Sequence, residues 1–228
     1  MAWPARRALK YGSELKWWNR ELETKIVPWY RGEIPKLWGR ELPAEEERIT
    51  SGRDEIENAV LTLRWADRTR YADLLQLPPR TTGFRRALDL GCGPLVPATW
   101  LQAEEVFGVE PIIEQFRQLG FPVDLYGAVL IAGRAEEMWM LPDDYFDLVV
   151  SHNAMDHMES VALVAEEIAR VATPDATIRL TICYREPTPT EPLRIRDEDV
   201  LLAFGDMGLE RMAERGPDEA LDVLWGRG

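Results

Sequence analysis

The strongest constraint on the fold is the way short apolar runs alternate with helical stretches from Phe84 onward. This alternation is typical of βαβ units and a largely parallel sheet, because parallel strands need a long crossover between them. The pattern predicts strands at Arg86–Leu90, Glu105–Val109, Val129–Ala132, Phe146–Ser151 and Thr177–Tyr184. It predicts helices at Ile112–Leu119, Ser160–Ala172 and Asp197–Met207.

Two more strands, Gly208–Arg215 and Ala220–Gly226, flank the turn Gly216-Pro217-Asp218. A connection this short predicts an antiparallel hairpin, which we expect to close one edge of the sheet. The predicted fold class is therefore α/β, with a seven-stranded, mostly parallel sheet, an antiparallel C-terminal hairpin and an N-terminal helical cap.

The first 80 residues differ from the rest, since their apolar residues follow a helical period. Residues 5–26 predict an amphipathic helix, and the prolines and glycines from Pro28 to Pro43 predict an irregular or briefly helical stretch after it. A second helix is expected to begin after Ser51, with Asp54 completing the cap, and to end at Pro78-Pro79. Its predicted apolar face is Ile56, Val60, Leu63, Tyr71 and Leu74. We expect two parts, a helical cap or lid over residues 1–80 and an α/β domain over residues 81–228.

Composition argues against several classes of protein. The net charge of −13 disfavours a nucleic-acid partner, because such a partner requires a basic surface. No stretch approaches the roughly 18 apolar residues of a membrane span, and the N-terminus lacks the pattern of a secretion signal. Cys92 and Cys183 form no C-x-x-C pair, so we expect a reduced, cytoplasmic setting and no zinc site.

Residues 87–94, Ala-Leu-Asp-Leu-Gly-Cys-Gly-Pro, are the most informative segment. A buried strand runs into a turn with glycine at alternate positions, which lets the backbone approach a ligand at the carboxyl end of the sheet. A dinucleotide site would require a third glycine, but that position is Val96, and Asp89 would lie poorly beside a diphosphate. S-adenosylmethionine (SAM) has no phosphate and carries a sulfonium and an ammonium, both of which suit a carboxylate.

This segment resembles motif I of the class I SAM-dependent methyltransferases. Further resemblances follow in the family's order: Val106–Glu110 is similar to the second strand, Gly133–Met138 to the adenine-side loop, and Phe146–Ser151 to the fourth strand. The resemblance covers about residues 84–184 and implies a Rossmann-like fold with SAM as cofactor. The cofactor-binding residues that it implies are Asp89, Gly91, Cys92, Gly93, Glu110, Pro111, Arg134, Ala135, Glu136, Ser151 and Asn153.

Two of these residues have distinct implied roles. Glu110 lies 21 positions after Asp89, and its two acceptor oxygens suit the vicinal diol of the ribose. Arg134 departs from the family's pattern, because it stands where an acid often binds the adenine amino group. Glu136 or backbone groups are expected to serve instead, and Pro94 and Pro97 are expected to shorten the first helix.

The two histidines of the chain, His152 and His157, both follow the predicted fourth strand. In methyltransferases this loop borders the methyl acceptor, and an imidazole has the intrinsic pKa for proton removal near neutrality. His157 is the first choice for a base or an acceptor-positioning group and His152 the second, while Asp156 could orient an imidazole. Alternatively, His157 caps the following helix or packs beside Trp139, and Asn153 fastens the loop.

Acceptor contacts are expected from two other regions. Arg185 precedes a proline-rich run that could roof the pocket, where it would meet an anionic or hydroxylated substrate; a surface connector is an equal alternative. Tyr11, Trp17, Trp18 and Trp38 are candidates to face the pocket, since aromatic planes suit sugar or ring substrates. The competing interpretation is that these tryptophans pack in the core or lid.

We therefore expect a SAM-dependent methyltransferase that acts on a small molecule, with a hydroxyl on a sugar or secondary metabolite slightly preferred over an amine. Nucleic-acid and protein methylation rank lower, because the chain is acidic and lacks N-P-P-[YFW] after the fourth strand. Two other classes stay open. A dinucleotide-dependent oxidoreductase is disfavoured by Val96, and a catalytically silent SAM-binding protein would bind S-adenosylhomocysteine without turnover.

Overall fold

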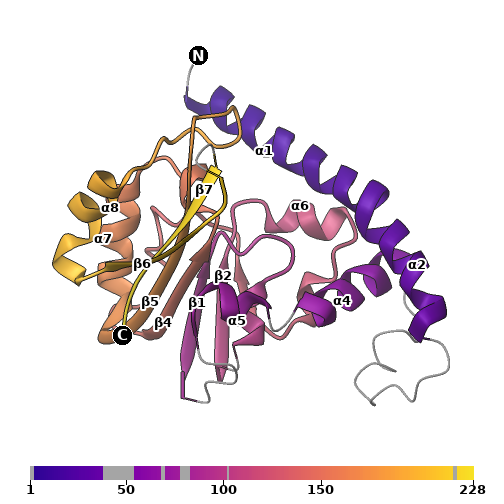
Figure 1. Cartoon of the computed structure of the whole chain (residues 1–228), viewed down its shortest axis with the longest axis horizontal. Coiled ribbons are helices and arrows are strands. Elements are labelled where there is room, and N and C mark those ends of the chain that lie inside the picture. The colour runs from indigo at the N-terminus through magenta and orange to yellow at the C-terminus, as the bar shows by residue number, and fades with distance from the viewer. Residues whose placement is uncertain (1–2, 38–53, 68–69, 78–82, 102, 218–219) are drawn as a thin grey trace.

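The computed structural model describes residues 3–37, 54–67, 70–77, 83–101, 103–217 and 220–228. Its centre is a seven-stranded sheet in the order β3-β2-β1-β4-β5-β7-β6 (Figure 1). The strands are β1 Arg86–Leu90, β2 Glu105–Val109, β3 Val129–Ile131, β4 Phe146–His152, β5 Ala172–Arg185, β6 Glu210–Arg215 and β7 Ala220–Arg227. Strands β1 to β5 pair in parallel, and β7 is antiparallel to both β5 and β6. The predicted α/β fold and its C-terminal hairpin are confirmed.

Strand β5 departs most from its predicted bounds, since it begins at Ala172 rather than at Thr177. Phe146 pairs with Ala172 and Leu148 with Thr177, so residues 173–176 bulge out between two pairs of the ladder. Pro174 lies in this bulge, where no hydrogen bond of the ladder requires the N–H that proline lacks. The same proline makes the segment read as a turn in the sequence.

The helices of the α/β part lie close to their predicted positions. They are α6 Ile113–Gln118, α7 Val161–Val171 and α8 Asp197–Phe204, the last followed by a 3₁₀ turn, Gly205–Met207. Ser160 caps α7, because its hydroxyl accepts a hydrogen bond from the Leu163 N–H. The crossover after β1 contains only a 3₁₀ turn, Pro97–Trp100, in agreement with the shortened first helix that the prolines predict.

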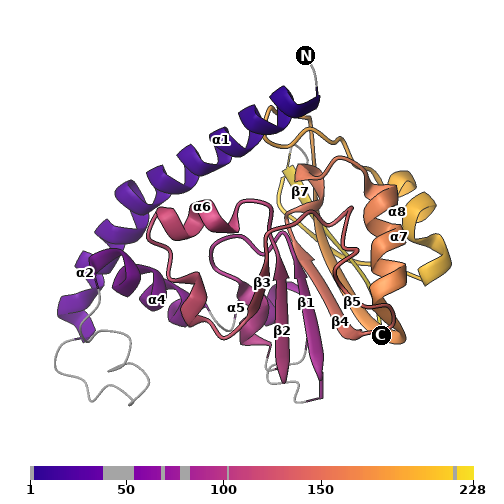
Figure 2. The same ribbon diagram turned by 180° about the vertical axis from the view of Figure 1, so that it is seen from behind.

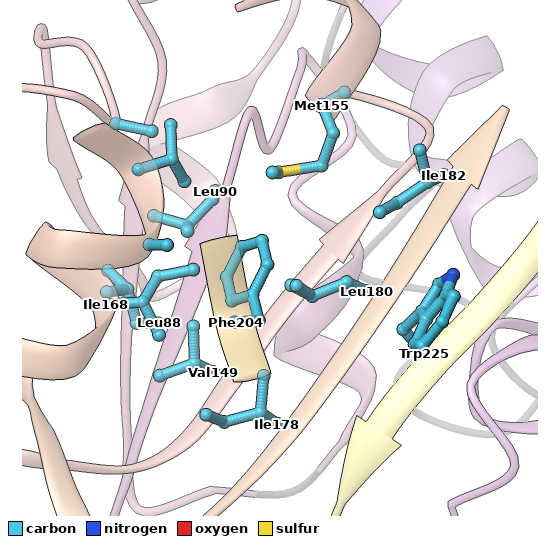
Figure 3. Close-up of a cluster of buried hydrophobic side chains, with 14 of the residues drawn as sticks. Leu88, Leu90, Val149, Met155, Ile168, Ile178, Leu180, Ile182, Phe204 and Trp225 are labelled. Atoms are coloured by element: carbon cyan, nitrogen blue, oxygen red, sulfur yellow. The ribbon is translucent and has the colours of Figure 1, made fainter. Parts of the chain in front are cut away.

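Apolar residues of the central strands alternate between the two faces of the sheet. On one face Leu88, Leu90 and Val149 pack against Ile168 of α7 and Phe204 of α8 (Figure 3). On the other face the alternate strand residues pack with the segment before β1; these residues are Ala87, Val106, Leu148 and Val150, with Tyr71, Ala72, Leu75 and Leu77. The central strands are thus covered on both sides, as expected of parallel strands.

The N-terminal segment differs from its prediction in one respect. Helix α1 (Trp3–Glu21), a π-helical turn (Leu22–Ile26) and helix α2 (Val27–Leu37) follow one another with helical dihedral angles at the junctions. Of the two predicted alternatives for the stretch from Pro28, irregular or briefly helical, the helical one is confirmed as far as Leu37; the difference is that this helix continues directly from the first one. The Val27 N–H closes an i→i+5 bond to the Leu22 carbonyl, and this wider turn accommodates Pro28 immediately after it.

The second predicted helix is two helices, α4 (Glu55–Asp67) and α5 (Arg70–Leu74). The cap is Asp54 itself, whose Oδ1 accepts a hydrogen bond from the Glu57 N–H at 3.0 Å. The predicted cap Ser51 and the prolines Pro78-Pro79 lie outside the described residues. Within the described part of the chain, no helix is long and apolar enough to cross a membrane.

A third apolar cluster joins the N-terminal helices to the α/β part. Leu22, Ile26 and Val60 pack with Ile113 and Phe116 of α6. From this anchor α1 extends across the end of the sheet toward β7, as both views show (Figure 1 and Figure 2). The position of α1 therefore depends on contacts made far along the chain.

Candidate active site

A cavity of about 940 Å³ lies between α1 and the carboxyl ends of the parallel strands. The residues that follow β1, β2, β4 and β5 form its floor, and residues 10–20 of α1 form its roof. The predicted binding residues that line it are Asp89, Gly91, Cys92, Gly93, Glu110, Pro111, Arg134, Ala135, Glu136, Asn153, Tyr11, Trp17, Trp18 and Arg185, together with His152 and His157. Carboxyl ends of parallel strands are where ligands bind in open α/β sheets, so this cavity is the candidate active site.

The turn after β1 holds its backbone against the cavity. Gly91 and Gly93 have φ angles of +64° and +56°, which residues with a Cβ rarely adopt. Asp89 is 1% exposed, and its Oδ2 accepts a hydrogen bond from the Ala98 N–H at 3.1 Å. Burial raises the pKa of Asp89 to about 7, and the nearby charge of Arg64 opposes that rise.

Glu110 follows β2 and holds the same turn from the other side. Its Oε2 accepts a hydrogen bond from the Gly93 N–H at 3.2 Å, and its Oε1 accepts one from the Ile112 N–H at 3.1 Å. Burial raises the pKa of Glu110 to about 8, and the charge of Glu14 on α1 adds to this rise. Each carboxylate oxygen has a second lone pair, so Glu110 can still accept hydrogen bonds from a ligand.

Arg134 lies in the loop after β3, and its guanidinium forms ion pairs with three carboxylates. Its Nη2 lies 2.5 Å from Glu159 Oε2 and 3.4 Å from Glu136 Oε1, and its Nη1 lies 3.1 Å from Glu137 Oε1. Glu159 also forms an ion pair with Arg7 of α1 at 2.5 Å. This chain of charges links the roof of the cavity to the loop beside Ala135.

The end of β4 and the loop after it bring both histidines to the cavity. His157 Nε2 lies 3.8 Å from Glu191 Oε1 and 4.0 Å from Asp156 Oδ1, and Lys10 of α1 donates a hydrogen bond to the His157 carbonyl. Burial lowers the pKa of His157 to about 4, so its imidazole is neutral near pH 7. The alternative that His157 caps the next helix is wrong, because Ser160 does so.

Two predicted site residues do not line the cavity. Ser151 is fully buried, and its hydroxyl donates to the Leu90 carbonyl at 3.0 Å, so it joins β4 to β1 instead of facing a cofactor. Asp156 is also fully buried, and its Oδ2 pairs with Arg185 Nε at 3.0 Å. Asp156 therefore lies behind His157 and fixes Arg185.

The aromatic residues of α1 have different roles. Trp18 packs edge-to-face against Phe116 and Phe121, at centroid distances of 6.0 and 5.6 Å, so it is also part of the helix anchor. Trp17 is 44% exposed and lies 4.8 Å from the Trp18 ring. Trp38 lies outside the described residues.

Comparison with known proteins identifies the central part of this fold. Residues 88–180 match a family of proteins described as a methyltransferase domain. Residues 88–180 therefore carry a methyltransferase domain of the class I SAM-dependent type. The methyltransferase is thus an enzyme, and SAM is its cofactor.

Solved structures agree on the fold. The methyltransferase is similar to YcgJ from Bacillus subtilis, with a TM-score of 0.54 and 15% identity over 71% of this chain and 97% of that chain. A SAM-dependent methyltransferase from Mesorhizobium loti gives a TM-score of 0.54 and 17% identity over 72% and 100% of the two chains. PH0226 from Pyrococcus horikoshii gives 0.51 and 19% over 72% and 90%. No curated protein sequence matches the chain.

The cavity of the methyltransferase suits SAM on structural grounds. The turn that contains Gly91 and Gly93 lies against the cavity, and the carboxylates of Asp89 and Glu110 face a space that would hold a cation and a diol. The residues of α1 lie outside the matched region 88–180, so the roof belongs to this chain's own N-terminal segment.

Several cavity residues were not predicted from the sequence. They are Lys10, Glu14, Tyr71, Glu159, Thr190 and Glu191. Glu191 stands in the proline-rich run after Arg185, so its position was a usable signal, whereas nothing in the local pattern marked Tyr71. The Glu14 carboxylate makes no hydrogen bond or ion pair with any residue in the described ranges, and burial raises its pKa.

Proposed function

We propose that this enzyme methylates a hydroxyl group of a small molecule held between α1 and the loops after β4 and β5, with His157 as the base. The observation that carries the proposal is a neutral imidazole at the wall of the cavity, with the nearest carboxylate oxygen, Glu191 Oε1, 3.8 Å from its Nε2. A volume of about 940 Å³ is in the range of small-molecule sites and supports a cofactor with a small acceptor. The net charge of −13 argues against a nucleic-acid acceptor.

The cofactor would lie across the carboxyl ends of β1, β2 and β3. Asp89, Glu110 and the backbone of Gly91 and Gly93 support its binding there, and Ala135 and Glu136 support the adenine side. We further propose that residues 1–80 act as a cap on a domain formed by residues 81–228, and that Tyr11, Trp17 and Arg185 contact the acceptor.

When bound, SAM would supply the methyl group. The acceptor oxygen would bond to the methyl carbon, and the electron pair of the broken carbon–sulfur bond would stay with sulfur. His157 Nε2 removes the hydroxyl proton, which makes the oxygen a better nucleophile. Glu191, 3.8 Å away, stabilises the imidazolium that results, and the Lys10 bond to the His157 carbonyl holds the loop in place. Arg185, fixed by Asp156, orients the acceptor.

The test is transfer of a labelled methyl group from SAM to pooled metabolites, with His157→Asn compared with the wild-type enzyme. Loss of a general base should lower kcat about 100- to 10,000-fold while S-adenosylhomocysteine affinity stays within twofold. The matched control is His152→Asn, which removes the other cavity histidine, at the end of β4, and should leave a far larger kcat. Equal turnover in the wild type and His157→Asn would remove this histidine from the mechanism.

An amine acceptor is the second candidate, and the half-buried Glu14 carboxylate in the cavity wall favours it because a partly desolvated acid attracts a cation. A neutral amine needs no base, so His157→Asn would then retain activity on amines, whereas Glu14→Gln would raise their KM. Tight S-adenosylhomocysteine binding with no turnover on any acceptor would instead indicate a catalytically silent SAM-binding protein.

A further inference from the structure

Arg64 of α4 is a buried cation that pairs with no carboxylate. Only 7% of it is exposed, and no acidic side chain in the described ranges forms an ion pair with it. Its guanidinium lies 3.5 Å from the centroid of the Tyr126 ring and 5.2 Å from that of the Trp100 ring. A charge removed from water costs free energy unless other groups compensate it. Aromatic faces compensate only part of this cost, so a further interaction is needed to explain an arginine at this position.

This guanidinium does not line the cavity, but it braces the chain that follows the glycine turn. Its Nη2 donates a hydrogen bond to Thr99 Oγ1 at 2.8 Å, and that hydroxyl donates in turn to the Val96 carbonyl at 2.9 Å. Val96 is fully buried with a φ angle of +43°, a conformation that a β-branched residue adopts at a cost. These bonds hold the 3₁₀ turn Pro97–Trp100, whose Ala98 N–H donates to the carboxylate of Asp89.

Arg64 and Asp89 are therefore two buried groups of opposite charge that contact the same short turn. Burial raises the pKa of Asp89 to about 7, and the Ala98 N–H and the charge of Arg64 oppose that rise. Burial lowers the pKa of Arg64 to about 10, and the charge of Asp89 is among those that oppose the fall. The other titratable groups that face Asp89 are Tyr71 of α5 and Cys92 of the turn, and burial raises the pKa of both, so both are neutral near pH 7.

The ionisation state of Asp89 decides whether it can attract a cation. A carboxyl group with a pKa of about 7 is ionised only in part at neutral pH, and a neighbouring positive charge favours its ionised form. We propose that Arg64 is a positioning residue for the cofactor, which braces the turn beside Asp89 and favours the ionised carboxylate to which the cofactor cation is attracted.

This inference rests on the proposed placement of the cofactor over Asp89 and Glu110. It gives α4 a part in cofactor binding, although α4 lies outside the matched region 88–180 and Arg64 does not line the cavity. The cap would then tune the charge of the floor of the site as well as covering it.

The experiment measures the affinity for S-adenosylhomocysteine, whose amino group is a cation, by calorimetry between pH 6.0 and 8.5. Arg64→Gln removes the charge but keeps an N–H donor, so the pKa of Asp89 should rise by about one. From a starting value of about 7, the affinity should fall about tenfold at pH 6.0 and less than about twofold at pH 8.5. Arg64→Met, the second neutral variant, keeps an unbranched buried chain and should give the same pH dependence.

Two matched variants separate the charge of Arg64 from its hydrogen bond. Arg64→Lys keeps the charge and should therefore keep the pH dependence of the wild type. Thr99→Val removes the hydrogen bond but leaves the guanidinium, so any loss of affinity should be the same at every pH. Glu110 titrates in all of these proteins, and the comparison between variants cancels its contribution.

A neutral ligand provides a further control. The nucleoside 5′-methylthioadenosine lacks the amino-acid end and carries no positive charge, so its affinity should change by the same factor at pH 6.0 and 8.5 in Arg64→Gln. Urea unfolding at both pH values checks that each variant is folded under the conditions of the titration.

The outcomes separate this inference from the proposed function. Wild-type protein that binds no S-adenosylhomocysteine at any pH refutes the cofactor placement itself. Wild-type protein that binds it, combined with a loss in Arg64→Gln and Arg64→Met that is equal at pH 6.0 and 8.5 or absent at both, refutes the role of Arg64 alone. A pH-dependent loss in Thr99→Val or Arg64→Lys as large as that in Arg64→Gln also refutes it, because both variants retain the positive charge.

Discussion

Replacing Gly91 by alanine tests how closely the glycine turn fits the loop after β4. A Cβ at residue 91 would lie 2.4 Å from the Ala154 Cβ, far inside the roughly 3.5–4.0 Å at which carbon atoms make contact. The φ angle of +64° adds strain of about 1–2 kcal/mol for a residue with a side chain. Overpacking adds about 1–3 kcal/mol, because each Cβ is bonded directly to its Cα and cannot move away without a backbone shift. We expect Gly91→Ala to lower the free energy of unfolding by about 2–5 kcal/mol.

Gly93→Ala provides the matched comparison. Its φ angle of +56° imposes the same kind of strain, but the nearest atom to a new Cβ would be Trp18 Cζ2 at 3.9 Å, an ordinary contact. The expected loss is therefore only about 1–2 kcal/mol. Adding Ala154→Gly to Gly91→Ala removes the clash but not the strain, so the double variant should recover about 1–3 kcal/mol as a coupling energy.

Urea unfolding with a constant m-value is measured for five proteins: the wild type, Gly91→Ala, Gly93→Ala, Ala154→Gly and the double variant Gly91→Ala/Ala154→Gly. The reasoning is refuted if Gly93→Ala is destabilised as much as Gly91→Ala, or if Ala154→Gly gives no recovery. Ala154 directly follows Asn153 and begins the loop that carries His157, so Gly91→Ala should also weaken S-adenosylhomocysteine binding.

Two further predictions concern pH and the roof of the cavity. The folded pKa values of Asp89 and Glu110, about 7 and about 8, lie above their ordinary values, so the folded state retains protons that the unfolded state has released. Their contribution to stability is thus complete below about pH 4 and is lost as pH rises toward 8, which urea midpoints at graded pH should show. Binding of the SAM cation near these two carboxyl groups should release their protons to the buffer. Binding heats that do not depend on the ionisation enthalpy of the buffer would contradict this. Glu159→Ala removes a carboxylate that pairs with both Arg7 and Arg134, so it should destabilise the protein by about 1 kcal/mol and speed amide exchange in α1. Exchange in α7, which Ser160 caps, is the internal reference, and unchanged exchange in α1 would show that this ion pair does not hold the roof.

The sequence by itself determined the elements whose signal is local. β1 and β2 have their predicted bounds, because a buried strand between turn residues is marked by its own composition. The segment Asp89-Leu90-Gly91-Cys92-Gly93 also predicted the cofactor, because these consecutive residues supply the glycine backbone and the carboxylate that suit SAM.

Tertiary structure decided what depends on residues distant along the chain. Arg7 meets Glu159 across 152 positions, and Tyr71 meets His152 from an element that no motif marks. Ser151 was predicted to face the cofactor, but its hydroxyl donates a hydrogen bond to the Leu90 carbonyl at the end of the neighbouring strand β1. Only the pairing of the strands could show this contact. Periodicity reports which residues of an element share a face, while the partner of that face is fixed by packing over the whole molecule. For that reason the floor of the cavity and the roof residues Tyr11, Trp17 and Trp18 were predicted from the sequence, whereas the contacts that hold the roof in place were not.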